Sequence, residues 1–242
     1  MKKLFGLAVL LAGSALLLAG GAPRAADEKK DSGWVQLFNG KDLTGWKLHP
    51  KPSKEIEAID EGRKKVDGKE VTVAYEGRLK GGKTVTLWRV EKGILIGGGP
   101  PSHLFSARGD YKDFHYLVEA MINDGGNSGQ YFRTKFEPGF PHGYEAQINA
   151  THRDPIKTGS LYLPKVKEVL VKKAPHKPDE WFTQEVIARG NHIIIKVNGK
   201  VTVDWKDPEN RYTQGHFALQ GHDPGSVMKF RKVAVKELPD KE

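Results

Sequence analysis

The chain has 242 residues, a formal net charge of +9 and no cysteine. Without cysteine, a disulfide scaffold and a thiol nucleophile are both excluded. The core must therefore stabilise the fold alone, and about 200 residues suffice, since a domain of this size buries roughly 70% of its unfolded surface. Basic residues are scattered among acidic ones, which indicates a charged surface and argues against a nucleic-acid binder.

Two lysines, an apolar run over 4–19 and a stretch of small residues follow one another at the start of the chain. This order is typical of a secretory signal peptide, which we expect over 1–26 with cleavage between about Ala22 and Ala26. The apolar run is too short for a good membrane span, and a lipoprotein anchor would need a cysteine. We expect an exported protein, periplasmic or extracellular, whose net charge falls to about +6 once the three basic residues of the leader are removed. Residues 27–32 are a flexible lead-in.

One all-β domain is expected over 33–240. Short segments alternate between apolar and polar residues and are separated by Gly and Asn turns, with no sustained helical period after residue 85. This pattern predicts an antiparallel β-sandwich or jelly roll. The expected strands in this part are 85–90, 93–96, 114–123, 129–136, 143–148, 181–189, 192–197, 200–205, 215–222 and 227–238.

Two further segments have distinct patterns. Asn198-Gly199 between two alternating runs predicts a hairpin with a type I′ turn, because both central residues of that turn need a positive φ. The polar stretch 47–83 is expected to be a long excursion at the rim of the fold, with one strand at 70–75 and weak helical character near 54–65.

Polar pairs occur on three expected strands, on the face that alternation turns away from the core. They are Tyr131 with Arg133, Glu145 with Gln147, and Gln220 with His222. Polar residues also cover the outer face of any antiparallel sheet, so an ordinary solvated face is one interpretation. The other is a concave cleft whose converging hydrogen-bonding groups suit the hydroxyls of a sugar.

Histidines are the remaining candidates for chemistry. His142 and His222 could act as a general base or as metal ligands, or be ordinary surface histidines. No pair has the helical HExxH spacing of a zinc site. The Asp-rich calcium loop and the Gly-x-Ser-x-Gly elbow are also absent from the sequence.

A family resemblance extends in order over nearly all of 33–238. It rests on five elements of the sequence: Phe38-Asn39-Gly40-Lys41-Asp42-Leu43-Thr44-Gly45-Trp46, Asn127-Ser128-Gly129 with Phe132-Arg133, Gly143-Tyr144-Glu145-Ala146-Gln147-Ile148, Thr158-Gly159-Ser160-Leu161-Tyr162, and Leu219-Gln220-Gly221-His222 with Phe230-Arg231-Lys232-Val233. Together they resemble the DUF1080 family, the 3-keto-disaccharide hydrolase domain.

The resemblance implies a concanavalin A-like jelly roll that cleaves the glycosidic bond of sugars oxidised to a ketone at C3. A C3 ketone acidifies the proton on C2, so a base can start an elimination that expels the C1 substituent, and water then adds. We expect Glu145 and His222 to be catalytic. The expected substrate-binding residues are Asn127, Tyr131, Arg133, His142, Gln147 and Gln220. A divalent metal ion is a candidate cofactor, with Glu145, His142 and His222 as candidate ligands.

The expected partner is a carbohydrate, either an oxidised di- or oligosaccharide or a glycoside. Two other functions remain open, because the same fold hosts both lectins and hydrolases. One is a non-catalytic, lectin-like carbohydrate-binding module. The other is an exported adhesion domain that uses its basic surface on acidic polysaccharide. A deep pocket with a perturbed carboxylate would favour the enzyme.

Overall fold

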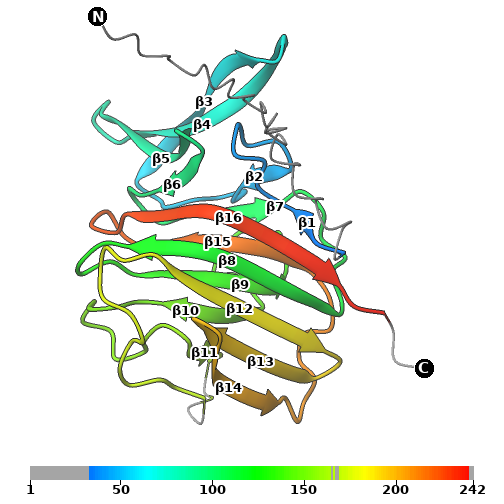
Figure 1. Ribbon diagram of the computed structural model, residues 1–242. Coiled ribbons are helices and arrows are strands. Elements are labelled where there is room, and N and C mark those ends of the chain that lie inside the picture. Colours follow the sequence, from blue (N-terminus) through cyan, green and yellow to red (C-terminus); the bar gives the residue numbers. More distant parts are fainter. Residues whose placement is uncertain (1–32, 165, 167–168, 240–242) are drawn as a thin grey trace, which may run out of the picture. The chain divides into compact units, whose positions relative to one another are not determined.

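Two antiparallel sheets make up the part of the chain that the computed structural model describes, residues 33–164, 166 and 169–239 (Figure 1). These residues contain sixteen strands and no helix. The predicted all-β antiparallel sandwich of jelly-roll type is therefore confirmed. The expected signal peptide (1–26) and lead-in (27–32) lie outside the described residues.

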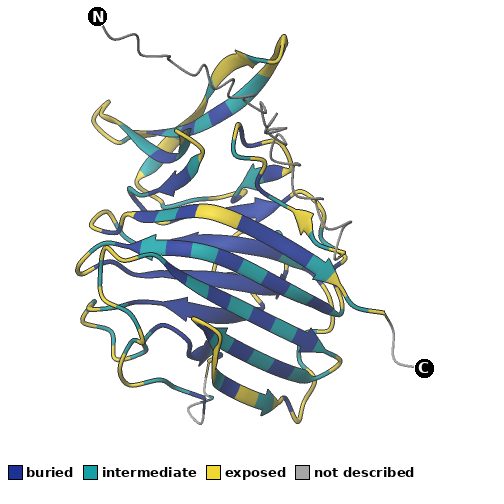
Figure 2. Cartoon of the chain, in the orientation of Figure 1, coloured by how far each residue is buried: buried dark blue, intermediate teal, exposed yellow. Residues whose placement is uncertain are grey.

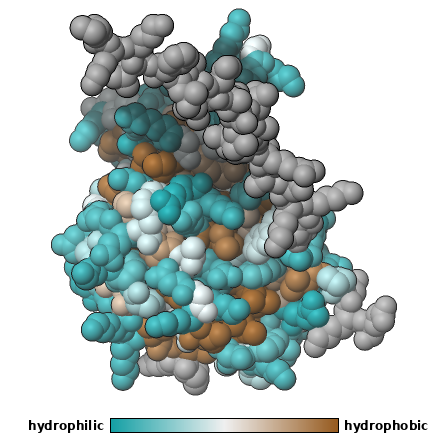
Figure 3. Space-filling model, viewed as in Figure 1, coloured by the Kyte–Doolittle hydropathy of each residue, from teal (hydrophilic) through white to brown (hydrophobic). Residues whose placement is uncertain are grey.

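The larger sheet has ten strands in the order β14-β13-β12-β8-β16-β6-β5-β4-β3, with β1 paired to β16. Its strands, in chain order, are β1 (Val35–Gln36), β3 (Ile56–Val66), β4 (Lys69–Leu79), β5 (Thr84–Glu91), β6 (Ile94–Gly97), β8 (Phe114–Ile122), β12 (Phe182–Arg189), β13 (His192–Val197), β14 (Lys200–Lys206) and β16 (Met228–Glu237). Hydrophilic and hydrophobic side chains are mixed on the molecular surface in the same view (Figure 3).

The smaller sheet has six strands in the order β11-β10-β9-β15-β7-β2. They are β2 (Trp46–Leu48), β7 (Ser102–Ser106), β9 (Ser128–Thr134), β10 (Tyr144–Ile148), β11 (Leu161–Tyr162) and β15 (His216–Gly221). Because β9, β10 and β15 are neighbours, the segments that carry the three polar pairs lie side by side.

The two sheets differ in how they are buried (Figure 2). Along β8 and β12 of the larger sheet, buried residues alternate with half-buried ones, as expected when one face packs on the core. Every residue of β9 and of β10 is buried. The face of the smaller sheet that points away from the core is therefore covered as well, so its polar side chains are not an ordinary solvated surface.

The hairpin expected at Asn198-Gly199 is confirmed. β13 pairs with β14, and φ is 49° at Asn198 and 76° at Gly199, as a type I′ turn requires.

The prediction for 47–83 is wrong in part. The segment near 54–65 is not helical: β3 and β4 form a hairpin of two 11-residue strands that extends the edge of the larger sheet. Its turn is Asp67-Gly68, with φ of 50° and 80°, the same turn chemistry as Asn198-Gly199. Charged residues along β3 obscure the strand pattern, as is common on an edge strand.

No helix in the described part of the chain is long and apolar enough to cross a membrane.

Candidate active site

A pocket of about 220 Å³ lies on the covered face of the smaller sheet. Strands β10, β11 and β15 contribute to its lining, together with the residue before β9 and the segments that follow β9, β10 and β15. The side chains that line it are Asn127, Phe140, Glu145, Gln147, Asp154, Ile156, Tyr162, Gln220 and His222. The cleft expected between the three polar pairs is thus present, but the residues that line it differ in part from those expected.

Glu145 is the central ionisable group of this pocket. On β10 it pairs with Tyr131 of β9 on one side and with Tyr162 of β11 on the other. Its carboxylate lies over Gly129, where a Cβ atom would overlap it. A glycine at 129 therefore creates the space that this carboxylate occupies.

Burial changes the acidity of Glu145. The residue is 3% exposed, and its Oε1 has no hydrogen-bond partner among the described residues. Desolvation raises the pKa of Glu145 from its ordinary value to about 8, the hydrogen bond from Tyr131 lowers it in part, and the nearby charge of Asp154 raises it further. At neutral pH this carboxyl group is therefore mostly protonated and can donate a proton.

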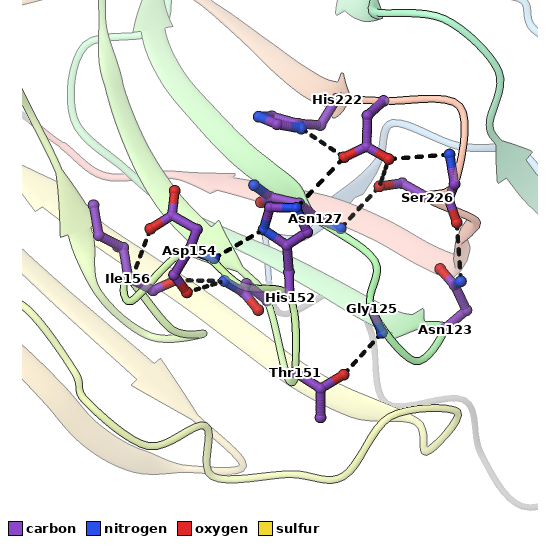
Figure 4. A network of polar contacts seen from close by, with 12 residues as sticks. Asn123, Gly125, Asn127, Thr151, His152, Asp154, Ile156, His222 and Ser226 are labelled. Carbon is purple, nitrogen blue, oxygen red and sulfur yellow. Dashed lines mark hydrogen bonds and ion pairs between the residues drawn. The ribbon is translucent and has the colours of Figure 1, made fainter.

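A chain of hydrogen bonds connects Gln147 to the opposite wall, and Figure 4 shows the part of it between Asn127 and Ser226. Gln147 donates from Nε2 to Oδ1 of Asn127 at 2.9 Å, and the backbone N–H of Asn127 donates to Oγ of Ser226 at 2.9 Å. Ser226 in turn donates to Oδ1 of Asp223 at 3.1 Å. These bonds hold the side chains of β9 and β10 in register with the loop after β15.

Asp223 orients His222. Its Oδ2 is 2.8 Å from Nδ1 of His222, and its Oδ1 also accepts the backbone N–H of Gly225 at 3.0 Å. Burial alone would raise the pKa of Asp223, but the hydrogen bonds from His222 and Ser226 outweigh it and hold the pKa below its ordinary value. An ionised Asp223 favours the His222 tautomer with the proton on Nδ1, which leaves Nε2 able to accept a proton.

The loop after β10 adds a second histidine. His152 Nε2 lies 3.8 Å from Oδ2 of Asp223, and the two histidine rings are 5.8 Å apart. Asn149 stabilises this loop, because its amide donates to the carbonyls of Asp154 and Ile156 at 3.0 and 2.8 Å. The loop therefore presents Asp154 and Ile156 to the pocket.

Gln220 lines the pocket, and the buried Tyr131 is its neighbour. Gln220 donates from Nε2 to the Tyr131 hydroxyl at 3.2 Å, while its Oε1 is buried without a partner among the described residues. Burial and the neighbouring Glu145 hold the pKa of Tyr131 well above its ordinary value. Tyr131 is only 1% exposed, so it supports Glu145 and Gln220 from beneath.

Arg133 does not project into the pocket with Glu145 and Gln147, and this prediction is wrong. The pairing of β9 with β15 shifts register between His216 and Ala218, and φ at Arg133 is 51°. Such a bulge ends the alternation on which the prediction rested. The guanidinium instead donates to the backbone carbonyls of three loops, those of Lys112, Gly190 and Tyr212, at 2.6–3.1 Å, and pairs with Asp113 at 3.1 Å.

His142 also lies outside the pocket. It is exposed on the loop after β9, and its Nδ1 is 2.6 Å from Oε1 of Glu137. The proposed ligand set of Glu145, His142 and His222 is therefore not brought together. Among the described residues, no group of three or more His, Cys, Asp or Glu side chains is arranged to hold a metal ion.

Some pocket residues were not identified from the sequence. Tyr162 ends the Thr-Gly-Ser-Leu-Tyr element, and its pairing with Glu145 follows only from the position of β11 at the sheet edge. Asp223 directly follows His222, and this adjacency of a carboxylate and an imidazole was the available signal. Phe140, Asp154 and Ile156 come from loops whose course alternation does not predict.

Residues 33–236 match the model of the 3-keto-alpha-glucoside-1,2-lyase-like domain. The chain belongs to this family. Membership associates the chain with carbohydrate chemistry, and the predicted resemblance is confirmed. No curated protein matches the chain.

Solved structures share the fold at low sequence identity. A candidate glycosyl hydrolase from Parabacteroides distasonis ATCC 8503 is 22% identical, with a TM-score of 0.59, over 86% of this chain and 94% of that one. A second candidate from the same organism is 20% identical, with a TM-score of 0.54, over 85% and 99%. SCLam, a non-specific endo-beta-1,3(4)-glucanase of family GH16, is 14% identical, with a TM-score of 0.50, over 86% and 93%. At these identities the likeness shows the jelly-roll fold alone.

Proposed function

We propose that the pocket cleaves the glycosidic bond of 3-keto-glycosides by elimination followed by hydration. The observation that carries this proposal is the pairing, in one pocket, of a buried carboxyl group with a pKa of about 8 and a histidine oriented by a carboxylate. The family match supports the choice of substrate class. Such a pair suits proton transfer in both directions near neutral pH.

The reaction begins at C2 of the sugar. The C3 ketone makes the C2 proton acidic, and Nε2 of His222 accepts it as the C2 electron pair moves toward the C3 oxygen as an enolate. The enolate then re-forms the ketone while the C1–O bond breaks, which leaves a C1–C2 double bond. Water adds across this double bond, with hydroxyl to C1 and a proton to C2, and the 3-keto sugar is released.

Protons are supplied and held by the same residues. Protonated Glu145 donates to the departing oxygen at C1, so the leaving group departs as a neutral alcohol. Asp223 stabilises the imidazolium that His222 becomes. Asn127 and Tyr162 also line the pocket, and their side-chain donors are available to the enolate oxygen.

The test is turnover of a panel of 3-keto-glycosides, measured as release of the aglycone with and without a chelator. The wild type should release aglycone, and Glu145→Gln and His222→Asn should each lower kcat by about 10²–10⁴. Glu137→Gln, outside the pocket, is the matched control and should retain activity. Unchanged turnover in both pocket variants would remove them from the mechanism, and sugar binding without any turnover would indicate a non-catalytic module.

The proposal includes export of the protein. The leader pattern over 1–26 supports it. N-terminal sequencing of the protein recovered from the periplasm or medium should give a first residue between Pro23 and Asp27, and an intact Met1 on the recovered protein would contradict it.

A further inference from the structure

A second pocket lies beside the first on the same face of the smaller sheet. It has a volume of about 290 Å³ and is formed where β7 meets the segment after β2 and the loop after β9. We call it the proline pocket, because its lining includes Pro52, Pro101 and Pro141, together with His49, His103 and Phe140. Nothing in the proposed bond cleavage uses these residues.

The two pockets are adjoining parts of one surface. Strand β7 pairs with β15, which places His103 opposite Gln220 and Ser102 opposite Gly221. Gln220 lines the first pocket and His103 the proline pocket, while Phe140 lines both. A ligand whose sugar ring contacts Glu145 therefore has a neighbouring space on the β7 side of the same face.

Most of the surface of the proline pocket is apolar, and several of its side chains contain rings. Its floor continues into a cluster of aromatic rings: His103 lies 5.5 Å from Tyr131, and His49 lies 5.8 Å from Phe105. Burial lowers the pKa of His103 to about 3, with a further contribution from His49, and burial also lowers the pKa of His49. Both imidazoles are therefore neutral at physiological pH and add to the ring-rich surface without a charge.

The ammonium-bearing side chain of Lys51 also lines this space, and few other polar groups do. Nε2 of His49, Nε2 of His103 and Oγ of Ser102 are buried without a hydrogen-bond partner among the described residues. A second sugar would bring several hydroxyl groups that need partners, and leaving them unpaired is costly. A planar ring instead packs on proline and aromatic side chains and leaves one or two hydrogen bonds for a substituent.

We propose that the proline pocket binds the aglycone of the substrate and that this aglycone is an aromatic ring with at most a few polar substituents. This inference rests on the proposed function, since it assigns the leaving-group side of the same site. The sugar occupies the pocket of Glu145 and His222, and the aromatic ring lies between the prolines and Phe140. The pocket then selects aryl glycosides over disaccharides.

Ser53 offers a way to block the proline pocket without touching the reacting groups. It lies at the rim of the pocket, and its backbone N–H donates to the Pro101 carbonyl at 2.8 Å. Ser53→Trp keeps this backbone contact and fills the space with a ring, while Ser53→Ala is the matched control that leaves the pocket open. Circular dichroism and thermal unfolding check that both variants fold.

The experiment compares phenyl glucoside with methyl glucoside, each in the 3-keto form for turnover and in the unoxidised form for calorimetric binding. We expect the wild type and Ser53→Ala to bind the phenyl compound about tenfold tighter than the methyl compound, which corresponds to about 1.4 kcal/mol. Ser53→Trp should lose this preference, and its KM should rise for the phenyl substrate only. Comparing variants on one substrate cancels the different leaving ability of phenol and methanol.

The experiment distinguishes failure of the proposed function from failure of the aglycone assignment. No turnover of either 3-keto compound overturns the proposed function, whereas binding of the unoxidised pair still decides the aglycone site. Equal or absent binding of the phenyl compound, or an equal effect of Ser53→Trp on both compounds, overturns the aglycone assignment.

Discussion

Replacing Glu145 with glutamine, which does not ionise, should make the protein more stable at high pH. The residue is 3% exposed, and its pKa is raised from 4.5 to about 8. At about 1.4 kcal/mol for each pKa unit, this difference corresponds to about 5 kcal/mol. That free energy is the cost of ionising Glu145 in the folded state relative to the unfolded chain.

The sign follows from linkage. Below about pH 4.5 the carboxyl group is neutral in both states, and it contributes no penalty. Between pH 4.5 and about 8 the unfolded chain ionises while folded Glu145 stays protonated, so the free energy of unfolding falls as pH rises. Above about pH 8 both states are ionised, and the full penalty remains. Glu145→Gln lacks this contribution.

Urea unfolding at pH 5, 7 and 9 measures the effect. The stability of Glu145→Gln minus that of the wild type should increase by roughly 4 kcal/mol between pH 5 and pH 9. Glu137→Gln is the control: the hydrogen bond from His142 lowers the pKa of Glu137, so the contribution of this carboxyl group to stability changes only below about pH 4.5, and its difference from the wild type should stay nearly constant between pH 5 and pH 9. A difference for Glu145→Gln that does not change with pH would refute the buried, proton-binding carboxyl group.

Three further predictions concern the same face of the sheet. Tyr131→Phe removes the hydrogen bond that lowers the pKa of Glu145, so the alkaline limb of the pH–rate profile should move to higher pH. In His222→Asn, turnover should fall by about 10²–10⁴ while the Kd for unoxidised phenyl glucoside, measured by calorimetry, changes little. Arg133→Met leaves backbone carbonyls and Asp113 without their buried cation, so urea unfolding should show a loss of about 3–5 kcal/mol with KM unchanged.

Alternation along the strands predicted the parts of the site that regular pairing determines. Glu145 and Gln147 share a face because β10 is regular over its length, and the strands that carry the three polar pairs, β9, β10 and β15, are neighbours in the sheet. Arg133 departs from this rule because it lies at a bulge and has a positive φ. The pattern of apolar and polar residues gives no sign of such a bulge.

The loops were the least predictable part of the site. His142 and Phe140 lie on the same short loop, yet only Phe140 lines the pocket, since the loop's course depends on tertiary contacts. The β3–β4 hairpin was missed for a different reason. Its Asp67-Gly68 turn was a usable local signal, but the charged edge strand before it hides the alternation.

Because the Glu145 carboxylate lies over Gly129, the residue type at one of these positions limits the residue type at the other. Any side chain at 129 would occupy the space of that carboxylate, so the two positions cannot vary independently. Among homologous chains with this fold, we expect glycine at 129 wherever an acidic residue stands at 145, and a larger residue at 129 only where 145 has become small. A chain with the second combination would keep the jelly roll without the proposed proton donor, so under the proposed function this pair of positions should distinguish catalytic members from binding modules.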